Sequence, residues 1–129
     1  LNPPVPGYNP RFGILLDMVG AERAVFPKET YSISYAPNLV NEVWGIAESK
    51  GYSDIFLDQR GAGVLDDHFI VYENTNIPVI DIINHTVGID GNIEFAPHWH
   101  THNDDLPIID KSILQAVGDV LLELIYNRI

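Results

Sequence analysis

The sequence lacks cysteine and is poor in basic residues, and each shortage excludes classes of protein. Without cysteine there are no disulfides, no thiolate metal ligands and no cysteine nucleophile. Only 7 Lys and Arg residues oppose 18 Asp and Glu residues, and the net charge of −11 repels phosphate. Nucleic acid and anionic membranes are therefore poor candidate partners. Apolar runs reach only about five residues, which is too short to cross a bilayer, so no membrane insertion is expected.

What is present is a globular composition of one-domain size. The chain has 129 residues, of which 46% are hydrophobic and 19% charged. Residues 1–10 contain four prolines and predict an extended Pro-rich segment or linker ahead of the domain at 11–129. No apolar signal-peptide core is visible there, and the chain does not start with Met. A processed or truncated product is therefore expected.

Strand-like and helix-like segments alternate along the chain, which favours a layered α/β fold. Strands are predicted at 12–19, 54–57 and 77–83, the first and last as buried runs. Helices are predicted at 36–50, 69–74 and 110–126, the last with Asp110 as its N-cap. The last helix is expected to bury one apolar stripe, made of Ile113, Leu114, Val117, Val120, Leu121, Leu124 and Ile125.

Two aspartates interrupt the apolar strands. Asp17 lies close to the C-terminal end of the first one, where an unpaired buried carboxylate is unfavourable and must meet a cation, a metal or a proton donor. Ligands of α/β folds bind at such strand ends; the alternative is that Asp17 caps the turn at Gly20. Asp81 poses the same question within 77–83, where it is either functional or a hydrogen-bond acceptor for a neighbouring loop.

A third polar group follows the glycine-containing turn at 61–63. Asp66, Asp67 and His68 are consecutive there. Paired carboxylates beside an imidazole can share protons or hold a metal, because like charges at close range raise one pKa. The alternative is that Asp67 caps the following helix and His68 is solvated.

The segment HWHTHND at 98–104 is the richest in potential ligands. Its three histidines alternate, so in an extended chain they point the same way. Imidazole suits zinc, but histidine-rich turns also occur on surfaces without a metal. No compact HExxH motif accompanies them.

These segments occur in an order that resembles a known family. ILLDMVGA (14–21), VLDDHFIVY (64–72), IPVIDII (77–83) and FAPHWHTHNDD (95–105) precede the final helix DKSILQAVGDVLLELIY. Together they resemble the C-terminal half of the M28 zinc aminopeptidases, and within that family the glutaminyl cyclase branch, including its bacterial members of animal type. The resemblance implies αβα layers with a mixed, mostly parallel central sheet (phosphorylase/hydrolase-like), of which this chain forms a partial domain.

The resemblance also implies roles for five residues. His100 matches the histidine ligand of the catalytic zinc, and Trp99 and Phe95 match aromatic walls of the substrate pocket. In cyclases, Asp17 and Asp66 belong to a carboxylate network beside the catalytic Glu. In two-zinc aminopeptidases, Asp17 instead ligates the second metal. Aminopeptidases more often carry Ser at the position of Asp66, so the DDH triplet favours a cyclase.

Two departures from the family accompany these matches. Asp81 stands where animal cyclases tend to carry histidine. The family's other zinc ligands and its general-base Glu lie in its N-terminal half, and no segment here matches them. The chain is therefore expected to be half of an enzyme, to bind zinc weakly by itself, and to expose an apolar sheet face that the missing N-terminal half covers.

The expected function is a zinc-dependent enzyme acting on peptide N-termini. The first expectation is a glutaminyl-peptide cyclotransferase, an acyltransferase that uses one zinc ion and releases ammonia. The alternatives are an M28 hydrolase of the two-zinc aminopeptidase type and a non-catalytic binding domain or degenerate relative. The resemblance further implies an extracytoplasmic location: periplasmic, secreted or surface-anchored.

Overall fold

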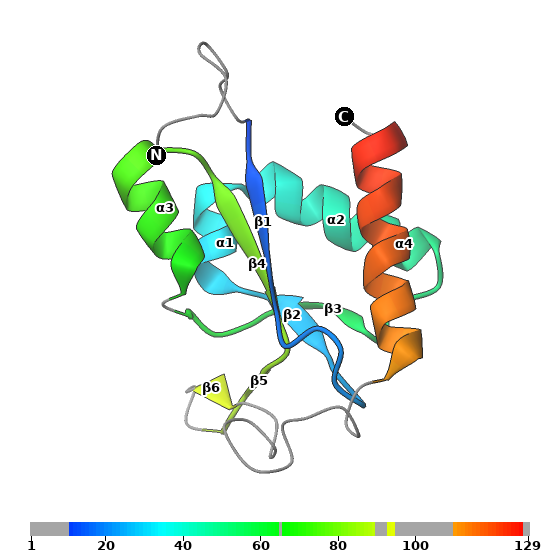
Figure 1. Ribbon diagram of the computed structural model, residues 1–129. Helices are drawn as coiled ribbons and strands as arrows, with labels where there is room; N and C mark the ends of the chain where they lie inside the picture. The colour runs from blue at the N-terminus through cyan, green and yellow to red at the C-terminus, as the bar shows by residue number, and fades with distance from the viewer. Residues whose placement is uncertain (1–10, 65, 90–92, 95–109, 128–129) are drawn as a thin grey trace.

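Two parallel strands lie at the centre of the computed structural model, which describes residues 11–64, 66–89, 93–94 and 110–127 (Figure 1). They are β1 (Gly13–Asp17) and β4 (Val79–Ile83), paired so that Leu15 lies opposite Asp81. All of β4 is buried, as its apolar run predicts. The expectation that the first strand is also fully buried is wrong for the described residues. There β1 has a strand partner on one edge only and its Leu16 is 41% exposed.

Two shorter strand pairs complete the described strands. β2 (Phe26–Lys28) and β3 (Phe56–Arg60) are parallel, whereas β5 (Thr86–Val87) and β6 (Ile93–Glu94) are antiparallel. The strand predicted at 54–57 thus begins two residues later, and β2 was not predicted because three residues show no periodicity. The expected α/β class with mixed, mostly parallel pairing is confirmed.

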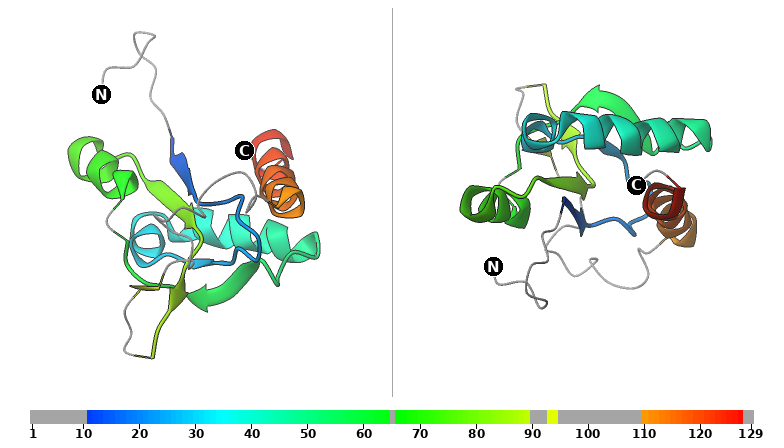
Figure 2. Two further views of the ribbon diagram at one scale, coloured as in Figure 1. Left: turned by 60° about the horizontal axis from the view of Figure 1, so that its bottom comes forward. Right: turned by 90° about the horizontal axis from the view of Figure 1, so that it is seen from above.

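Four helices surround the strands. α1 (Thr30–Tyr35) and α2 (Pro37–Ser49) cover one face of the β1–β4 pair, and α4 (Lys111–Asn127) packs beside α2 (Figure 2). α3 (Asp67–Thr75) lies on the side of the molecule opposite α4. Within the described ranges, no helix is long and apolar enough to cross a membrane.

The hydrophobic core lies where α2 and α4 meet the strands. The predicted helix at 36–50 is confirmed as α2, and Asp110 caps α4 as expected, since its Oδ1 accepts a hydrogen bond from Ser112 N at 2.8 Å. The predicted apolar stripe of α4 is too wide, because Leu114 and Ile125 are exposed. Contact with α2 buries a narrower row at a spacing close to 3.6 residues, consisting of Ile113, Ala116, Val117, Val120 and Leu124.

Candidate active site

Three aspartates from three different elements meet beside the β1–β4 pair. Asp17 is the last residue of β1, Asp81 is the third residue of β4, and Asp66 is the N-cap residue of α3. The side chain of Asp66 lies close enough to those of Asp17 and Asp81 that both lower its pKa. The structure therefore brings together the two acids predicted as catalytic and adds Asp81 to them. We call these three residues the acid cluster.

Asp66 has a structural role as well. Its Oδ1 accepts a hydrogen bond from the backbone N–H of Asp67 at 2.8 Å, which caps α3. The alternative interpretation of the DDH triplet, in which Asp67 is the cap and His68 is solvated, is wrong on both counts. His68 is completely buried. Capping fixes the position of the Asp66 carboxyl group, so the start of α3 holds it beside Asp17 and Asp81.

The acid cluster contains buried carboxyl oxygens without hydrogen-bond donors. No N–H or hydroxyl donor of the described residues reaches Asp66 Oδ2 or either carboxyl oxygen of Asp81, and all three atoms are buried. Two ionised carboxylates in such surroundings repel each other, and like charges at close range raise one pKa. A proton on one of these carboxyl groups is therefore favoured.

The electrostatics identify Asp81 as the residue that holds the proton. Burial, reinforced by the negative charges of Asp66, Glu29 and Asp17, raises the pKa of Asp81 to about 9. Burial also works to raise the pKa of Asp66, but the hydrogen bond from Asp67 N and the interactions with the Asp17 and Asp81 side chains prevail and lower it. At neutral pH, Asp81 is therefore protonated and Asp66 is ionised.

A second polar layer lies behind the acid cluster. Glu29, at the start of α1, is completely buried, and its Oε1 lies 2.7 Å from His68 Nε2. His68 Nδ1 in turn lies 3.7 Å from Asp81 Oδ2. Sequence reasoning did not identify Glu29, because a glutamate in the segment FPKET has no apolar pattern around it that would signal burial. Its only local signal is its position just before a helix start.

The remaining predicted site residues fall outside the described part of the chain. Phe95, Trp99 and His100 belong to the range 95–109, so the structure does not test the predicted zinc ligand or the aromatic pocket walls. Among the residues that are described, no group of three His, Asp or Glu side chains is arranged to hold a metal ion. These residues alone do not fit a closed zinc site, which needs three or four ligands.

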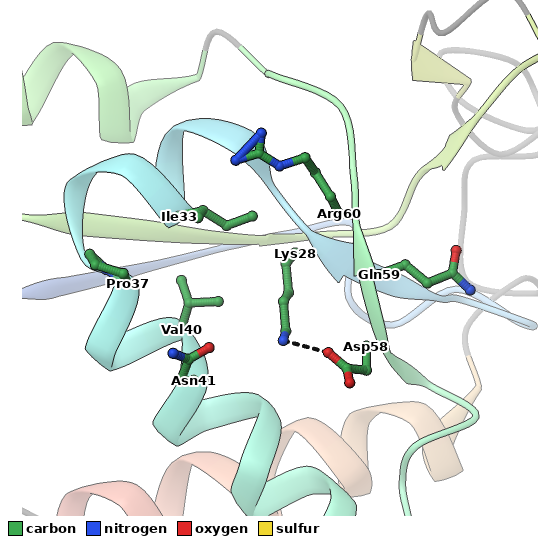
Figure 3. A pocket seen from close by; sticks show the side chains of 8 residues that line it. All are labelled: Lys28, Ile33, Pro37, Val40, Asn41, Asp58, Gln59 and Arg60. Atoms are coloured by element: carbon green, nitrogen blue, oxygen red, sulfur yellow. Dashed lines mark hydrogen bonds and ion pairs between the residues drawn. The ribbon is translucent and has the colours of Figure 1, made fainter.

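A hollow of about 250 Å³ lies elsewhere, between β2, β3 and the start of α2 (Figure 3). The ion pair between Lys28 Nζ and Asp58 Oδ1, at 2.6 Å, crosses one side of it. It shares no residue with the acid cluster, and the side chains around it are Lys28, Ile33, Pro37, Val40, Asn41, Asp58, Gln59 and Arg60. Among the described residues, the acid cluster therefore remains the candidate site.

Comparison with known proteins gives the family of the chain. The family model described as peptidase family M28 matches residues 2–125. No curated protein matches the chain. The crystal structure of Porphyromonas gingivalis glutaminyl cyclase is similar over 99% of this chain and 44% of its own, with 44% identity and a TM-score of 0.89.

Two further solved structures carry other descriptions. A Zn-dependent exopeptidase from Parabacteroides distasonis is 44% identical over 98% of this chain and 43% of its own, with a TM-score of 0.88. A leucine aminopeptidase precursor from Bacteroides thetaiotaomicron is 48% identical over 98% of this chain and 41% of its own, with a TM-score of 0.86. This chain thus spans less than half the length of each of these relatives. Because the family model matches almost all of it, the chain belongs to peptidase family M28.

Proposed function

We propose that this chain forms part of a zinc-dependent glutaminyl-peptide cyclotransferase, in which the N-terminus of a peptide is the substrate. The observation that supports a cyclase most directly is the acid cluster, in which the carboxyl groups of Asp17 and Asp66 lie close together. Carboxyl groups that share protons suit a proton-transfer network, whereas a metal ligand must be ionised and directed at the metal. The similarity to the Porphyromonas gingivalis cyclase supports the same assignment.

In this proposal a peptide with N-terminal glutamine closes into pyroglutamate. The α-amine nitrogen forms a bond to the carbonyl carbon of the side-chain amide, the bond from that carbon to the amide nitrogen breaks, and ammonia leaves with a proton taken from the amine. His100, together with ligands from outside this chain, would hold a zinc ion, which when bound would supply a Lewis acid for the side-chain carbonyl. A glutamate, also from outside this chain, carries the proton from the amine to the leaving group.

The residues of this chain have two tasks in that reaction. Asp66 and Asp17 hydrogen-bond with the proton-carrying glutamate and set its pKa for its task. Asp66 Oδ2 suits this role, because it is buried and none of the described residues donates a hydrogen bond to it. Trp99 and Phe95 form apolar walls that exclude water from the glutamine side chain. We also assign the enzyme an extracytoplasmic location, by analogy with its family.

A two-zinc aminopeptidase is the second candidate, and the similarity to a leucine aminopeptidase precursor favours it. In that enzyme, Asp17 would ligate the second zinc ion, and the two ions would supply the activation of water for hydrolysis of the first peptide bond. A third candidate is a non-catalytic relative whose acids only satisfy one another. Metal content and substrate distinguish the three.

The test is an assay of the complete enzyme on two substrates, with zinc counted per site. Ammonia release from glutaminyl peptides with one zinc supports the cyclase. Release of free amino acid from a leucine arylamide, with two zinc ions per site, contradicts the cyclase and supports the aminopeptidase. A protein that has neither activity and no zinc binding that depends on His100 is the non-catalytic relative.

A further inference from the structure

Glu29 and His68 have no task in the mechanism above, yet both lie in the molecule's most buried polar group. Glu29, Ser32, His68 and Asp81 are all completely shielded from solvent. They come from the starts of α1 and α3 and from β4, which are neighbours in the fold (Figure 1). Burial of four polar side chains is unfavourable unless they satisfy one another, so their mutual geometry is informative.

The surroundings of Glu29 determine its charge. Its Oε1 accepts hydrogen bonds from Ser32 N at 2.8 Å and Ser32 Oγ at 2.7 Å, and its Oε2 accepts from Tyr31 N at 2.8 Å and Val64 N at 3.0 Å. Ser32 Oγ has to direct its hydrogen at Glu29, because it accepts a hydrogen bond from Asp81 N. A carboxyl group surrounded by donors is ionised and can only accept.

This charge decides which nitrogen of His68 carries hydrogen. Because Glu29 Oε1 has no proton to give, His68 Nε2, 2.7 Å away, must be the donor. In a neutral imidazole, Nδ1 then has a lone pair and no hydrogen. His68 Nδ1 is buried without a hydrogen-bond partner among the described residues, and the nearest acidic oxygen is Asp81 Oδ2 at 3.7 Å.

Aromatic side chains hold the ring in this orientation. The centroid of the His68 ring lies 6.3 Å from the centroid of the Tyr31 ring and 6.1 Å from that of the Tyr35 ring. Tyr35 is itself stacked on Tyr72 at 4.0 Å. The tyrosine rings therefore restrict rotation of the imidazole, so that its Nε2 stays beside Glu29 and its Nδ1 faces Asp81.

We infer that Glu29 and His68 are positioning residues for the acid cluster: Glu29 holds His68 with hydrogen on Nε2, and the bare Nδ1 facing Asp81 keeps the acid proton on Asp81. A lone pair opposite Asp81 disfavours the ionised carboxylate, whereas an N–H at the same place would stabilise it. This inference rests on the proposed function for its catalytic consequence, but the tautomer of His68 does not depend on it.

The first experiment measures the tautomer directly. Two-bond ¹H–¹⁵N correlation spectra of the intact protein distinguish protonated from bare imidazole nitrogens, and His68→Gln assigns the signals of His68. We expect a protonated Nε2 and a bare Nδ1 at neutral pH. A hydrogen on Nδ1, in the other neutral tautomer or in a doubly protonated ring, overturns the inference, whatever reaction the enzyme catalyses.

The second experiment measures the effect on turnover in the complete enzyme. Gln at position 68 places an amide nitrogen near the position of Nε2, so it keeps a donor for Glu29 but leaves nothing opposite Asp81. We expect kcat for ammonia release to fall about tenfold to a hundredfold with KM unchanged, which is the usual cost of losing a supporting partner.

The matched control is His85→Gln. His85 is equally buried, but its ring contacts the backbone at Ile83 O and Ala62 N and no member of the acid cluster. We expect this variant to lose stability while keeping kcat. A His68→Gln enzyme with unchanged kcat, or one whose kcat falls no further than that of His85→Gln, refutes the positioning role. A wild-type enzyme that does not cyclise glutaminyl peptides refutes the proposed function but not this inference. The tautomer of His68, measured by the correlation spectra, then remains its test.

Discussion

Replacing Asp81 by asparagine tests the central electrostatic result, that a buried aspartate of β4 holds a proton at neutral pH. Asparagine has nearly the shape of a neutral aspartic acid and can donate a hydrogen bond to Asp66, but it never ionises. The two side chains therefore differ chiefly in the proton that Asp81 must keep. We predict that D81N stabilises the fold, and increasingly so as pH rises.

The sign and the size follow from the shift in pKa. The unfolded chain releases the Asp81 proton near pH 3.8, whereas the folded chain keeps it up to about pH 9. Between these values the folded state binds the extra proton, so the contribution to stability is complete below pH 3.8 and is lost as pH rises towards 9. Each pH unit costs about 1.4 kcal/mol, so between about pH 5 and pH 8 wild type should lose at most about 4 kcal/mol that D81N retains.

Urea denaturation followed by circular dichroism at several pH values measures this difference. The control is D58N, because Asp58 is exposed and its ion pair with Lys28 lowers its pKa, so it is ionised throughout the measured range. We expect the gap in unfolding free energy between D81N and wild type to widen with pH, and that between D58N and wild type to stay constant. A D81N gap that does not change with pH means that Asp81 is ionised in the folded state, which would refute the proton assignment.

Three further outcomes are expected. His100→Ala should abolish turnover and reduce the zinc content of the complete enzyme, measured by kinetics and elemental analysis, and retained activity would contradict the ligand assignment. Leu124→Ala should cost about 2–5 kcal/mol in urea denaturation because Leu124 is 1% exposed, whereas Leu122→Ala, at a 55% exposed position, should change stability by less than about 0.5 kcal/mol. Gly61→Ala should lower the melting temperature, since its new Cβ would overlap the imidazole of His85, and an unchanged melting temperature would show that the ring can move aside.

Sequence reasoning succeeded where the pattern is long and local. The run 77–83 predicts β4, and Pro37 at the first turn together with the apolar spacing predicts α2. The rule that ligands gather at strand ends singled out Asp17, and the family resemblance paired it with Asp66. Those two side chains do meet, although their catalytic role stays a prediction.

Sequence reasoning failed where the position or burial of a residue depends on packing between distant segments. β2 and α1 are too short to show a period. His68 looks like a solvated residue after two aspartates, and only the approach of α1 and β4 to the start of α3 buries it. Glu29 is satisfied by donors as far away as Val64, a contact that no local spacing encodes.

The parallel pairing of β1 with β4 also has a consequence for the order of assembly. Parallel strands need a crossover connection, and here the crossover includes β2, β3 and three helices. Asp17 and Asp81 can therefore come together only after all of these elements have been synthesised. An N-terminal fragment that ends before β4 has none of the contacts that bury Glu29 from that strand, and it lacks Asp81. Cleavage between α3 and β4 would therefore divide the acid cluster between two fragments, with Asp17 and Asp66 on one and Asp81 on the other.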